Sequence, residues 1–469
     1  MAEIIQRCGE ISFKHMLKLA GPIFAANLAI VCSGTIDTIM AGQLSADELA
    51  GVALGIAVAT WISISLAGVL QGVSPIAGFA YGARHLQDVG RALTQCLYLA
   101  IALTIPGVAL TLCTDLWMAI SNVTGPVATI ATQYLVFAAA ALPAILIGRC
   151  FIAVNAAVSR PAASMCVTLL MVGLKAPCNM LFIYGWGDWQ GFGGAGVGLS
   201  TCVLNWGAIV VYWLIWRLDP YYEQMRLKTA VRPDAGEMFK QLKIGVPVGI
   251  SIFFEMTSYT LMAIFIARTG AVILAAHQIV ANLVWLYYVI PFAIGLSGTV
   301  LVSQSLGAKQ PESARKATFM VMNTALVAAL IVSAATWVFR EEIAALYTRD
   351  VDVQKVAVSF LTVVVFYHIA DAVQCAGTCI LRGYRITLWP MVAHCVLLCG
   401  VGLTIGYCTS GFLEGSRYAW GAIAFWIGAA AGLTTAALFI APYTLAACNR
   451  EAGRKWFDFS ALKKAQHSY

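Results

Sequence analysis

The hexapeptide LKLAGP at residues 17–22 returns as LKIGVP at residues 242–247, a displacement of 225 positions. A second pair of matching segments, GAR at 82–84 and GAK at 307–309, has the same displacement. A constant displacement over separate matches indicates an internal duplication, a common construction of membrane transporters. The sequence therefore predicts two halves that are built alike.

The composition places most of the chain inside a lipid bilayer. Hydrophobic residues make up 60% of the 469 positions, charged residues only 11%, and the mean hydropathy is +0.82. A soluble domain carries about 25% charged residues, so this chain cannot build an aqueous surface over its whole length. Apolar segments of bilayer-spanning length recur twelve times. The sequence predicts an all-α integral membrane protein with twelve transmembrane helices in two pseudo-symmetric six-helix lobes.

The duplication also sets the expected domain boundaries. We expect residues 1–225 to form an N-terminal six-helix lobe with its following cytoplasmic loop, and residues 226–448 to form a C-terminal six-helix lobe. Residues 449–469 form a basic cytoplasmic tail in this scheme. Because both halves begin on the same side of the membrane, they are parallel repeats about an axis along the membrane normal. Such lobes can rock against each other, which favours a transporter.

The positive charges predict the orientation. Of the 29 lysines and arginines, 23 lie on one side of the predicted membrane and five on the other, with Lys175 inside it. Loops rich in lysine and arginine stay in the cytoplasm, so we expect both termini there. The formal net charge of +7 mostly reflects this asymmetry. It indicates the lipid bilayer as a partner and no nucleic acid.

Four ionisable residues fall deep inside predicted spans, namely Asp37, Lys175, Glu255 and Asp371. Each would cost about 2.5–3.5 kcal/mol at the centre of a membrane helix, so each must be paired, neutralised or open to a wet cavity. The displacement relates Asp37 to Met262 and Glu255 to Ile30, so the acids do not follow the duplication. They indicate an ion or substrate pathway, and a hydrogen-bonded acid that fixes helix packing is the alternative.

The surroundings of these residues suggest partners. Asp37 is the intramembrane acid in the same half as Lys175, so we expect an ion pair between them. Tyr367 and His368 precede Asp371 by four and three residues and can share its helix face. Tyr367 could donate a hydrogen bond to the carboxylate. His368 could relay protons, or it could be an ordinary packed histidine.

A polar and aromatic stripe lies on the eighth predicted span. Gln278 and Asn282 are one turn apart, and Trp285 follows on the same face. Amides followed by aromatic rings suit a cavity for organic cations, which aromatic faces attract. Ordinary hydrogen bonding between helices is the alternative for the two amides.

Several motifs resemble the multidrug and toxic compound extrusion (MATE) family, with the NorM-type branch as the closest match. The motifs are IDTIMAGQLSADELAGVALG at 36–55, FFE at 253–255, AAHQIVAN at 275–282, and DAVQ and LRGY within 371–384. The resemblance covers nearly the whole chain. It implies a multi-pass antiporter of the bacterial inner (plasma) membrane. Such a protein exports cationic, amphipathic drugs and toxic organic compounds in exchange for inward Na⁺ or H⁺.

The resemblance also implies roles for residues. Asp37 matches the family's first-helix acid, and Glu255 and Asp371 match carboxylates linked to cation or proton coupling. Na⁺ is the metal ion that Glu255 and Asp371 would hold. Family positions for an aromatic pair and a fifth-helix amide complete the expected substrate cavity. Its residues are Tyr367, His368, Gln278, Asn282, Trp285, Tyr287, Tyr288 and Asn179.

Lys175 departs from the family pattern, because NorM relatives usually carry an amide there. A fixed ammonium beside Asp37 would occupy the space of a bound cation or proton, so the pair modulates coupling and Glu255 and Asp371 become the expected coupling site. In the expected mechanism, these carboxylates take up the coupling ion from outside and release the cationic substrate by competition.

Two other interpretations stay open. A lipid-linked oligosaccharide flippase shares the broad architecture, but it would favour a cavity of arginines and lysines, whereas the deep charges here are mostly acidic. A membrane-embedded enzyme would need a metal motif or a nucleophile with its base, and the sequence has no H-E-x-x-H and no serine elbow. We therefore expect no enzymatic activity, no cofactor beyond the coupling ion, and a monomer.

Overall fold

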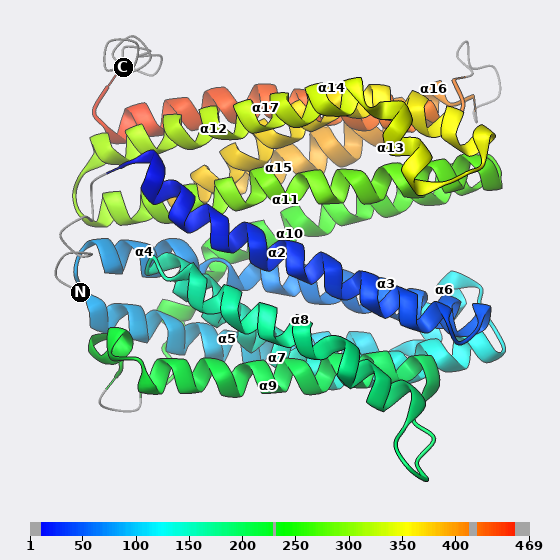
Figure 1. Cartoon of the computed structure of the whole chain (residues 1–469). Coiled ribbons are helices and arrows are strands. Elements are labelled where there is room, and N and C mark those ends of the chain that lie inside the picture. The colour runs from blue at the N-terminus through cyan, green and yellow to red at the C-terminus, as the bar shows by residue number, and fades with distance from the viewer. Residues whose placement is uncertain (1–10, 228–230, 412–419, 455–469) are drawn as a thin grey trace. The chain divides into compact units, whose positions relative to one another are not determined.

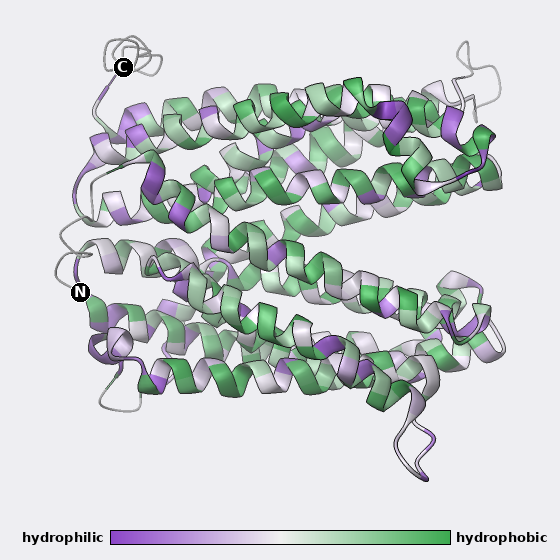
Figure 2. Ribbon diagram, viewed as in Figure 1, coloured by the Kyte–Doolittle hydropathy of each residue, from purple (hydrophilic) through white to green (hydrophobic). Residues whose placement is uncertain are grey.

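The protein, described here by a computed structural model, is helical throughout residues 11–227, 231–411 and 420–454, the part of the chain that the structure describes, apart from its loops and one isolated bridge between Trp186 and Trp189. Within these residues, twelve segments are long and apolar enough to cross a membrane, so the predicted fold class is confirmed. Figure 1 shows these long helices. Figure 2 shows hydrophobic residues along most of their length and hydrophilic residues gathered toward their ends.

The first six spans begin and end where local sequence signals place their caps. Ser45 accepts a hydrogen bond from the backbone N–H of Glu48 at 3.1 Å and so caps the second span. Prolines occupy the first position of the fourth and fifth spans, where no backbone donor is needed. The spans are α2 (Phe13–Gly42), α3 (Ala46–Leu70) continued by α4 (Val73–Gly82), α5 (Leu86–Leu112), α7 (Pro126–Ala157), α8 (Pro161–Tyr184), and η1 (Gly193–Ala195) continued by α9 (Gly196–Leu218). The short helices α6 (Thr114–Ser121) and η2 (Pro220–Met225) lie between or after them.

The second six spans repeat this construction with one irregularity. The eleventh span is broken into three pieces, and its central piece is a π-helix, which the apolar pattern did not predict. Asp350 caps the tenth span by accepting from the backbone N–H groups of Asp352 and Val353. The spans are α10 (Ala235–Ala267), α11 (Ala271–Gly307), α12 (Pro311–Val338), α14 (Val351–Gly383), the run of α15 (Leu388–Ala393), η3 (His394–Gly402) and α16 (Leu403–Thr409), and α17 (Ile423–Glu451). The short helix α13 (Arg340–Tyr347) precedes α14.

The contacts divide the chain into two compact units, and the division differs from the expected boundary at residue 225. The first unit includes residues 25–249, and the second includes residues 11–24 and everything described after residue 249. Both breaks fall two residues after a proline inside a helix, Pro22 in α2 and Pro247 in α10. The two breaks are also 225 residues apart, which is the displacement of the internal repeat.

The chain that follows η2 is attached to the first unit by side-chain hydrogen bonds. Gln95 on α5 donates from Nε2 to the carbonyl oxygen of Arg232 at 2.9 Å, and its Oε1 accepts from the backbone N–H of Asp234 at 2.9 Å. Tyr98, one turn further along α5, donates to the carbonyl oxygen of Val231 at 3.0 Å. These bonds explain why the described residues between 226 and 249 belong to the first unit and not to the second.

The start of α10 packs very closely on α3 within the first unit. A Cβ added to Gly245 would lie 1.8 Å from the carbonyl oxygen of Val69, and one added to Gly72 would lie 2.4 Å from the carbonyl oxygen of Gln241. Backbone atoms cannot move aside as side chains do. The glycines therefore fix how closely the two helices approach.

We expect Gly245→Ala to lower the melting temperature of the purified protein. Forcing a methyl group against a backbone carbonyl costs about 1–3 kcal/mol of overpacking. The matched control is Gly207→Ala on α9, where an added Cβ meets no atom within 4 Å. At such a site alanine is the better helix former, so the control should melt at the same or a higher temperature. Thermal unfolding followed with a thiol-reactive dye measures both, and equal melting temperatures would contradict the close contact.

The core of the second unit surrounds Trp426 on α17, which is fully buried. Tyr367 on α14 meets the Trp426 ring edge-on, with centroids 6.0 Å apart, and Phe360 lies 6.2 Å from the same ring. Aromatic rings at these separations attract each other beyond their burial. This core holds α14 in place beside the acids described next.

Candidate functional site

The first unit contains a buried polar cluster that joins three helices. Lys175 on α8 lies 3.1 Å from Asp37 Oδ1 on α2, with side chains that are 4% and 9% exposed. The ammonium also donates to Thr201 Oγ1 on α9 at 2.6 Å. Asn179, one turn after Lys175, donates from Nδ2 to Asp37 Oδ1 at 2.8 Å. The expected Lys175–Asp37 pair is therefore present.

This cluster is balanced in charge. One carboxylate and one ammonium compensate each other. The hydroxyl of Thr201 donates a hydrogen bond to the carbonyl oxygen of Val197 at 3.0 Å, so its oxygen can accept from Lys175. Buried charges persist when they are paired and hydrogen-bonded in this way. The carboxylate of Asp37 is thus paired with a cation of the protein itself, the ammonium of Lys175. Thr201 was missed in the sequence because a threonine within an apolar helix carries no pattern of its own.

The second unit contains two buried acids without a compensating cation. Glu255 on α10 is 8% exposed and Asp371 on α14 is 2% exposed. The two carboxylates are close enough to repel each other electrostatically. Among the described residues, neither forms an ion pair, and Glu255 makes no hydrogen bond either. Glu255 and Asp371 are therefore buried in the second unit, and in the described structure, unlike Asp37, they have no cation beside them.

Asp371 has one hydrogen-bond partner in the described structure, and it is neither of the expected neighbours. Gln374 donates from Nε2 to Asp371 Oδ1 at 3.0 Å. The hydroxyl of Tyr367 and Nε2 of His368 have no hydrogen-bond partner within the described residues. The His368 ring instead lies 5.4 Å from the ring of Tyr287. The helical spacing brought the three residues to one side of α14, but the predicted hydrogen bond from Tyr367 to Asp371 is wrong.

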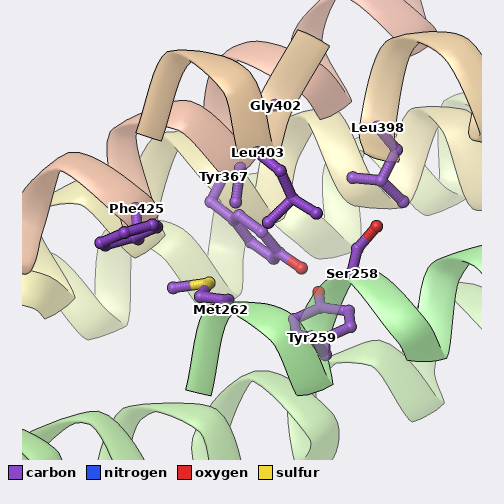
Figure 3. Close-up of a pocket in the computed structure, with 9 residues that line it drawn as sticks. Ser258, Tyr259, Met262, Tyr367, Leu398, Gly402, Leu403 and Phe425 are labelled. Atoms are coloured by element: carbon purple, nitrogen blue, oxygen red, sulfur yellow. The ribbon is translucent and has the colours of Figure 1, made fainter. Parts of the chain in front are cut away.

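Tyr367 faces a small cavity within the second unit. Figure 3 shows its hydroxyl and that of Ser258 directed toward the same space, with Met262 and Phe425 at one end. The hydroxyl of Ser258 also has no hydrogen-bond partner among the described residues. The cavity measures about 20 Å³, and a single water needs about 10–15 Å³ by the same measure. In this state the space suits one water molecule and is too small for a drug.

The stripe predicted on α11 is exposed as a face of that helix. Gln278, Asn282 and Trp285 are all exposed, and the Trp285 ring stacks on Tyr288 at 5.7 Å. Asn282 Oδ1 accepts a hydrogen bond from the hydroxyl of Tyr347 at 3.0 Å. The amides of Gln278 and Asn282 are therefore followed along α11 by the stacked rings of Trp285 and Tyr288.

Tyr287 and Tyr288 point to different surroundings although they are adjacent. Tyr288 continues the stack to Phe292, with centroids 5.4 Å apart. Tyr287 is turned to α12, where its hydroxyl accepts from Thr336 Oγ1 at 3.0 Å. Tyr288, which is half-buried, therefore continues the aromatic stack that begins at the exposed Trp285, and Tyr287 belongs to the packing between α11, α12 and α14.

Metal-ligand residues are not clustered in the described part of the chain. No group of three or more histidine, cysteine, aspartate or glutamate side chains is close enough to hold one ion there. The carboxylate oxygens of Glu255 and Asp371 are hard donors, the kind that alkali cations and protons prefer.

Comparisons with known proteins agree with the duplicated architecture. A family model described as MatE matches the chain twice, over residues 22–181 and over residues 247–408. The chain is 34% identical over 391 residues to a "Probable multidrug resistance protein NorM" of Aromatoleum aromaticum, covering 83% of this chain and 84% of the relative. It is 30% identical over 443 residues to a protein of the same description from Neisseria meningitidis, covering 93% and 94% of the two chains.

Solved structures show the same fold at low sequence identity. The crystal structure described as "MATE in complex with MaL6" superposes with a TM-score of 0.87 at 17% identity and covers 97% of this chain and 100% of the other. A structure described as an outward-facing multidrug resistance MATE family transporter gives a TM-score of 0.84 at 17% identity, covering 96% and 98%. At this identity the likeness establishes the arrangement of helices.

Proposed function

Because the chain belongs to the MatE family, we propose that it is a secondary antiporter that exports cationic, amphipathic drugs and toxic organic compounds in exchange for inward Na⁺ or H⁺. The named relatives are multidrug resistance proteins, and the solved structures of the same fold include multidrug transporters. The family gives the class of function. The charges inside the two units give the site and the mechanism.

One observation carries the proposal: the acid of the first unit is neutralised by the protein, and the acids of the second unit are not. Asp37 has the ammonium of Lys175 at 3.1 Å, whereas Glu255 and Asp371 have no ion-pair partner among the described residues. Two uncompensated carboxylates in a low-dielectric site require a proton or a cation from outside the protein. The exported molecule and the coupling ion both meet this requirement.

The mechanism follows from competition for these oxygens. When the site is open to the outside, Glu255 and Asp371 take up Na⁺ or a proton and lose their attraction for a cationic substrate, which leaves. When the site is open to the cytoplasm, the coupling ion leaves and the restored negative charge attracts a new substrate. A ligand shifts a conformational equilibrium only by its difference in affinity between the two states. Here one charge gained or lost in a site of low dielectric supplies that difference.

We assign the first unit a modulating role. Lys175 holds Asp37 in a compensated pair, so uptake of a further cation there would have to displace an ammonium that is tethered to α8. Coupling through Glu255 and Asp371 requires no such displacement. Asn179 supports the pair by its hydrogen bond to Asp37.

We assign the recognition of the substrate's organic part to the exposed face of α11. Stacked aromatic rings attract quaternary and other delocalised cations through their faces. Trp285 and Tyr288 provide such faces, and Asn282 and Gln278 add amides about one and two turns before Trp285. Tyr287 and His368 pack against each other and would act on the substrate through the position of α14.

The proposal places the protein in the inner (plasma) membrane of a bacterium, with both termini in the cytoplasm and the lipid bilayer as its surroundings. The charge asymmetry of the loops supports this orientation. The cycle needs one chain, no nucleic acid, and no cofactor besides the coupling ion. It contains no covalent step, so we propose no enzymatic activity.

Export from vesicles tests this function. Purified protein is reconstituted into liposomes, and accumulation of tetraphenylphosphonium is measured under an imposed Na⁺ gradient at equal pH and under a pH gradient without Na⁺. We expect accumulation under at least one gradient and its loss when an ionophore collapses that gradient. Absence of accumulation under both gradients, with correctly folded and inserted protein, would refute the proposal.

A further inference from the structure

A chain of four buried polar side chains connects Asp371 to a second helix that carries a coupling acid. Gln374 Nε2 lies 3.0 Å from Asp371 Oδ1, and Gln374 Oε1 lies 2.7 Å from Nε2 of His394. His394 Nδ1 lies 2.5 Å from Ser251 Oγ. All four residues are at most 5% exposed. Such a network in an apolar core is stable only when every member is satisfied.

While Asp371 is ionised, the chemistry of the groups fixes the direction of every bond. An ionised carboxylate can only accept, so the amide nitrogen of Gln374 must face Asp371 and its oxygen must face His394. The amide oxygen can only accept, so Nε2 of His394 carries a proton. In neutral histidine the other ring nitrogen then accepts, and it accepts from the hydroxyl of Ser251. The donors therefore run in one direction, from Ser251 to Asp371.

His394 lies where it can link the helix of Asp371 to the helix of Glu255. His394 is the first residue of the π-helix η3, so it lies where the eleventh span departs from α-helical geometry. Short π-helical segments often occur at functional sites. Ser251 lies on α10 four residues before Glu255, so both face the same side of that helix. The chain thus joins the helix of Asp371 to the helix of Glu255.

We propose that His394 is a positioning residue of the coupling site, which holds the Gln374 amide with its N–H₂ group toward Asp371. This inference rests on the proposed function, because it concerns the same carboxylate. Without His394 the amide is free to rotate and to present its oxygen to Asp371. An oxygen there repels the ionised carboxylate, so the charge that attracts the substrate becomes less stable. The sequence offered no sign of this role, because Ser251, Gln374 and His394 come from three separate spans.

Equilibrium binding of tetraphenylphosphonium to the full-length protein, in Na⁺-free buffer at one fixed pH, tests the proposal. His394→Phe keeps the ring volume but removes both hydrogen bonds, and we expect about tenfold weaker binding, the effect of losing one bond to a charged acceptor. His394→Gln returns a donor near the Nε2 position and should bind within about twofold of the unmodified protein. The matched control His277→Phe replaces another buried histidine of the same unit, whose Nδ1 has no partner within the described residues, and should bind normally.

A double variant separates positioning from general structural damage. If His394 acts through the charge of Asp371, then Asp371→Asn combined with His394→Phe should bind no more weakly than Asp371→Asn alone. Effects that add in full, or unchanged binding by His394→Phe, would overturn the proposal. If the unmodified protein does not bind tetraphenylphosphonium, the proposed function itself would be refuted.

A smaller change keeps the test valid if His394→Phe does not fold. Ser251→Ala removes one hydroxyl from the far end of the chain, and we expect binding about threefold weaker. Ser297→Ala is its control, because that buried serine donates to the carbonyl oxygen of Ile294 in its own helix. Equal binding by these two serine variants would also overturn the proposal.

Discussion

Replacing Asp371 with asparagine is expected to lower the affinity for tetraphenylphosphonium about 10- to 150-fold, the range for losing a charged interaction of about 1.5–3 kcal/mol. The substitution changes the charge and little else. Asparagine has the same shape, and its Oδ1 can still accept the hydrogen bond from Gln374. Export driven by the coupling ion should fall to background, because the substrate and the ion bind at the same carboxylate. Glu255→Gln should have an effect of the same sign.

The matched control for this prediction lies on the same helix. Asp352 is an exposed acid at the start of α14, with a side chain that is 76% exposed and that pairs with Lys355. Asp352→Asn removes the same charge by the same substitution, and it should change neither binding nor export. Equal losses in the two variants would mean that the net charge of the protein, and not the buried site, governs transport. Full activity of Asp371→Asn would contradict the mechanism.

Lys175→Met is expected to destabilise the protein by about 3–5 kcal/mol, the cost of leaving a buried charge without its partner. Methionine fills much of the space of the lysine side chain, so cavity formation contributes little. Asp37 would keep the hydrogen bond from Asn179 but would lose the ammonium at 3.1 Å. Thr201 would lose its donor as well. Denaturant or thermal unfolding in detergent measures the change.

The double variant Asp37→Asn, Lys175→Met should recover most of this loss, because it removes both charges together. A comparison with an exposed pair separates burial from charge. Lys355 lies 3.3 Å from Asp352, and both side chains are more than 70% exposed, so Lys355→Met should cost at most about 1 kcal/mol. A small effect of Lys175→Met, with no recovery in the double variant, would contradict the account of a compensated first unit.

The architecture and the positions of the acids could be predicted because both leave long-range signals in the sequence. The duplication and the apolar spans follow from patterns over many residues. The Lys175–Asp37 pair follows from elimination, since a lysine so deep in a membrane helix needs an acid and the half contains one candidate. These inferences use which residues are present and how deep they lie, and not how side chains are oriented.

Features that depend on orientation or on packing between spans could not be predicted. The spacing of Tyr367 and Asp371 placed them on one side of α14, but a hydrogen bond also requires a compatible rotamer, and Tyr367 packs against Trp426 instead. The boundary inside α10 depends on contacts that Gln95 and Gly245 make with distant segments. The partners of His394 come from α10 and α14, so no local pattern connects them.

The central claim is that the coupling ion and the exported cation occupy the carboxylates of the second unit in turn. Equilibrium binding of tetraphenylphosphonium, titrated with Na⁺ at fixed pH and with protons in the absence of Na⁺, measures this directly. The account predicts that the apparent dissociation constant rises with the concentration of at least one of the two ions, and that Asp371→Asn removes this dependence. A dissociation constant that stays the same across both titrations, in protein that still exports the compound, would contradict it.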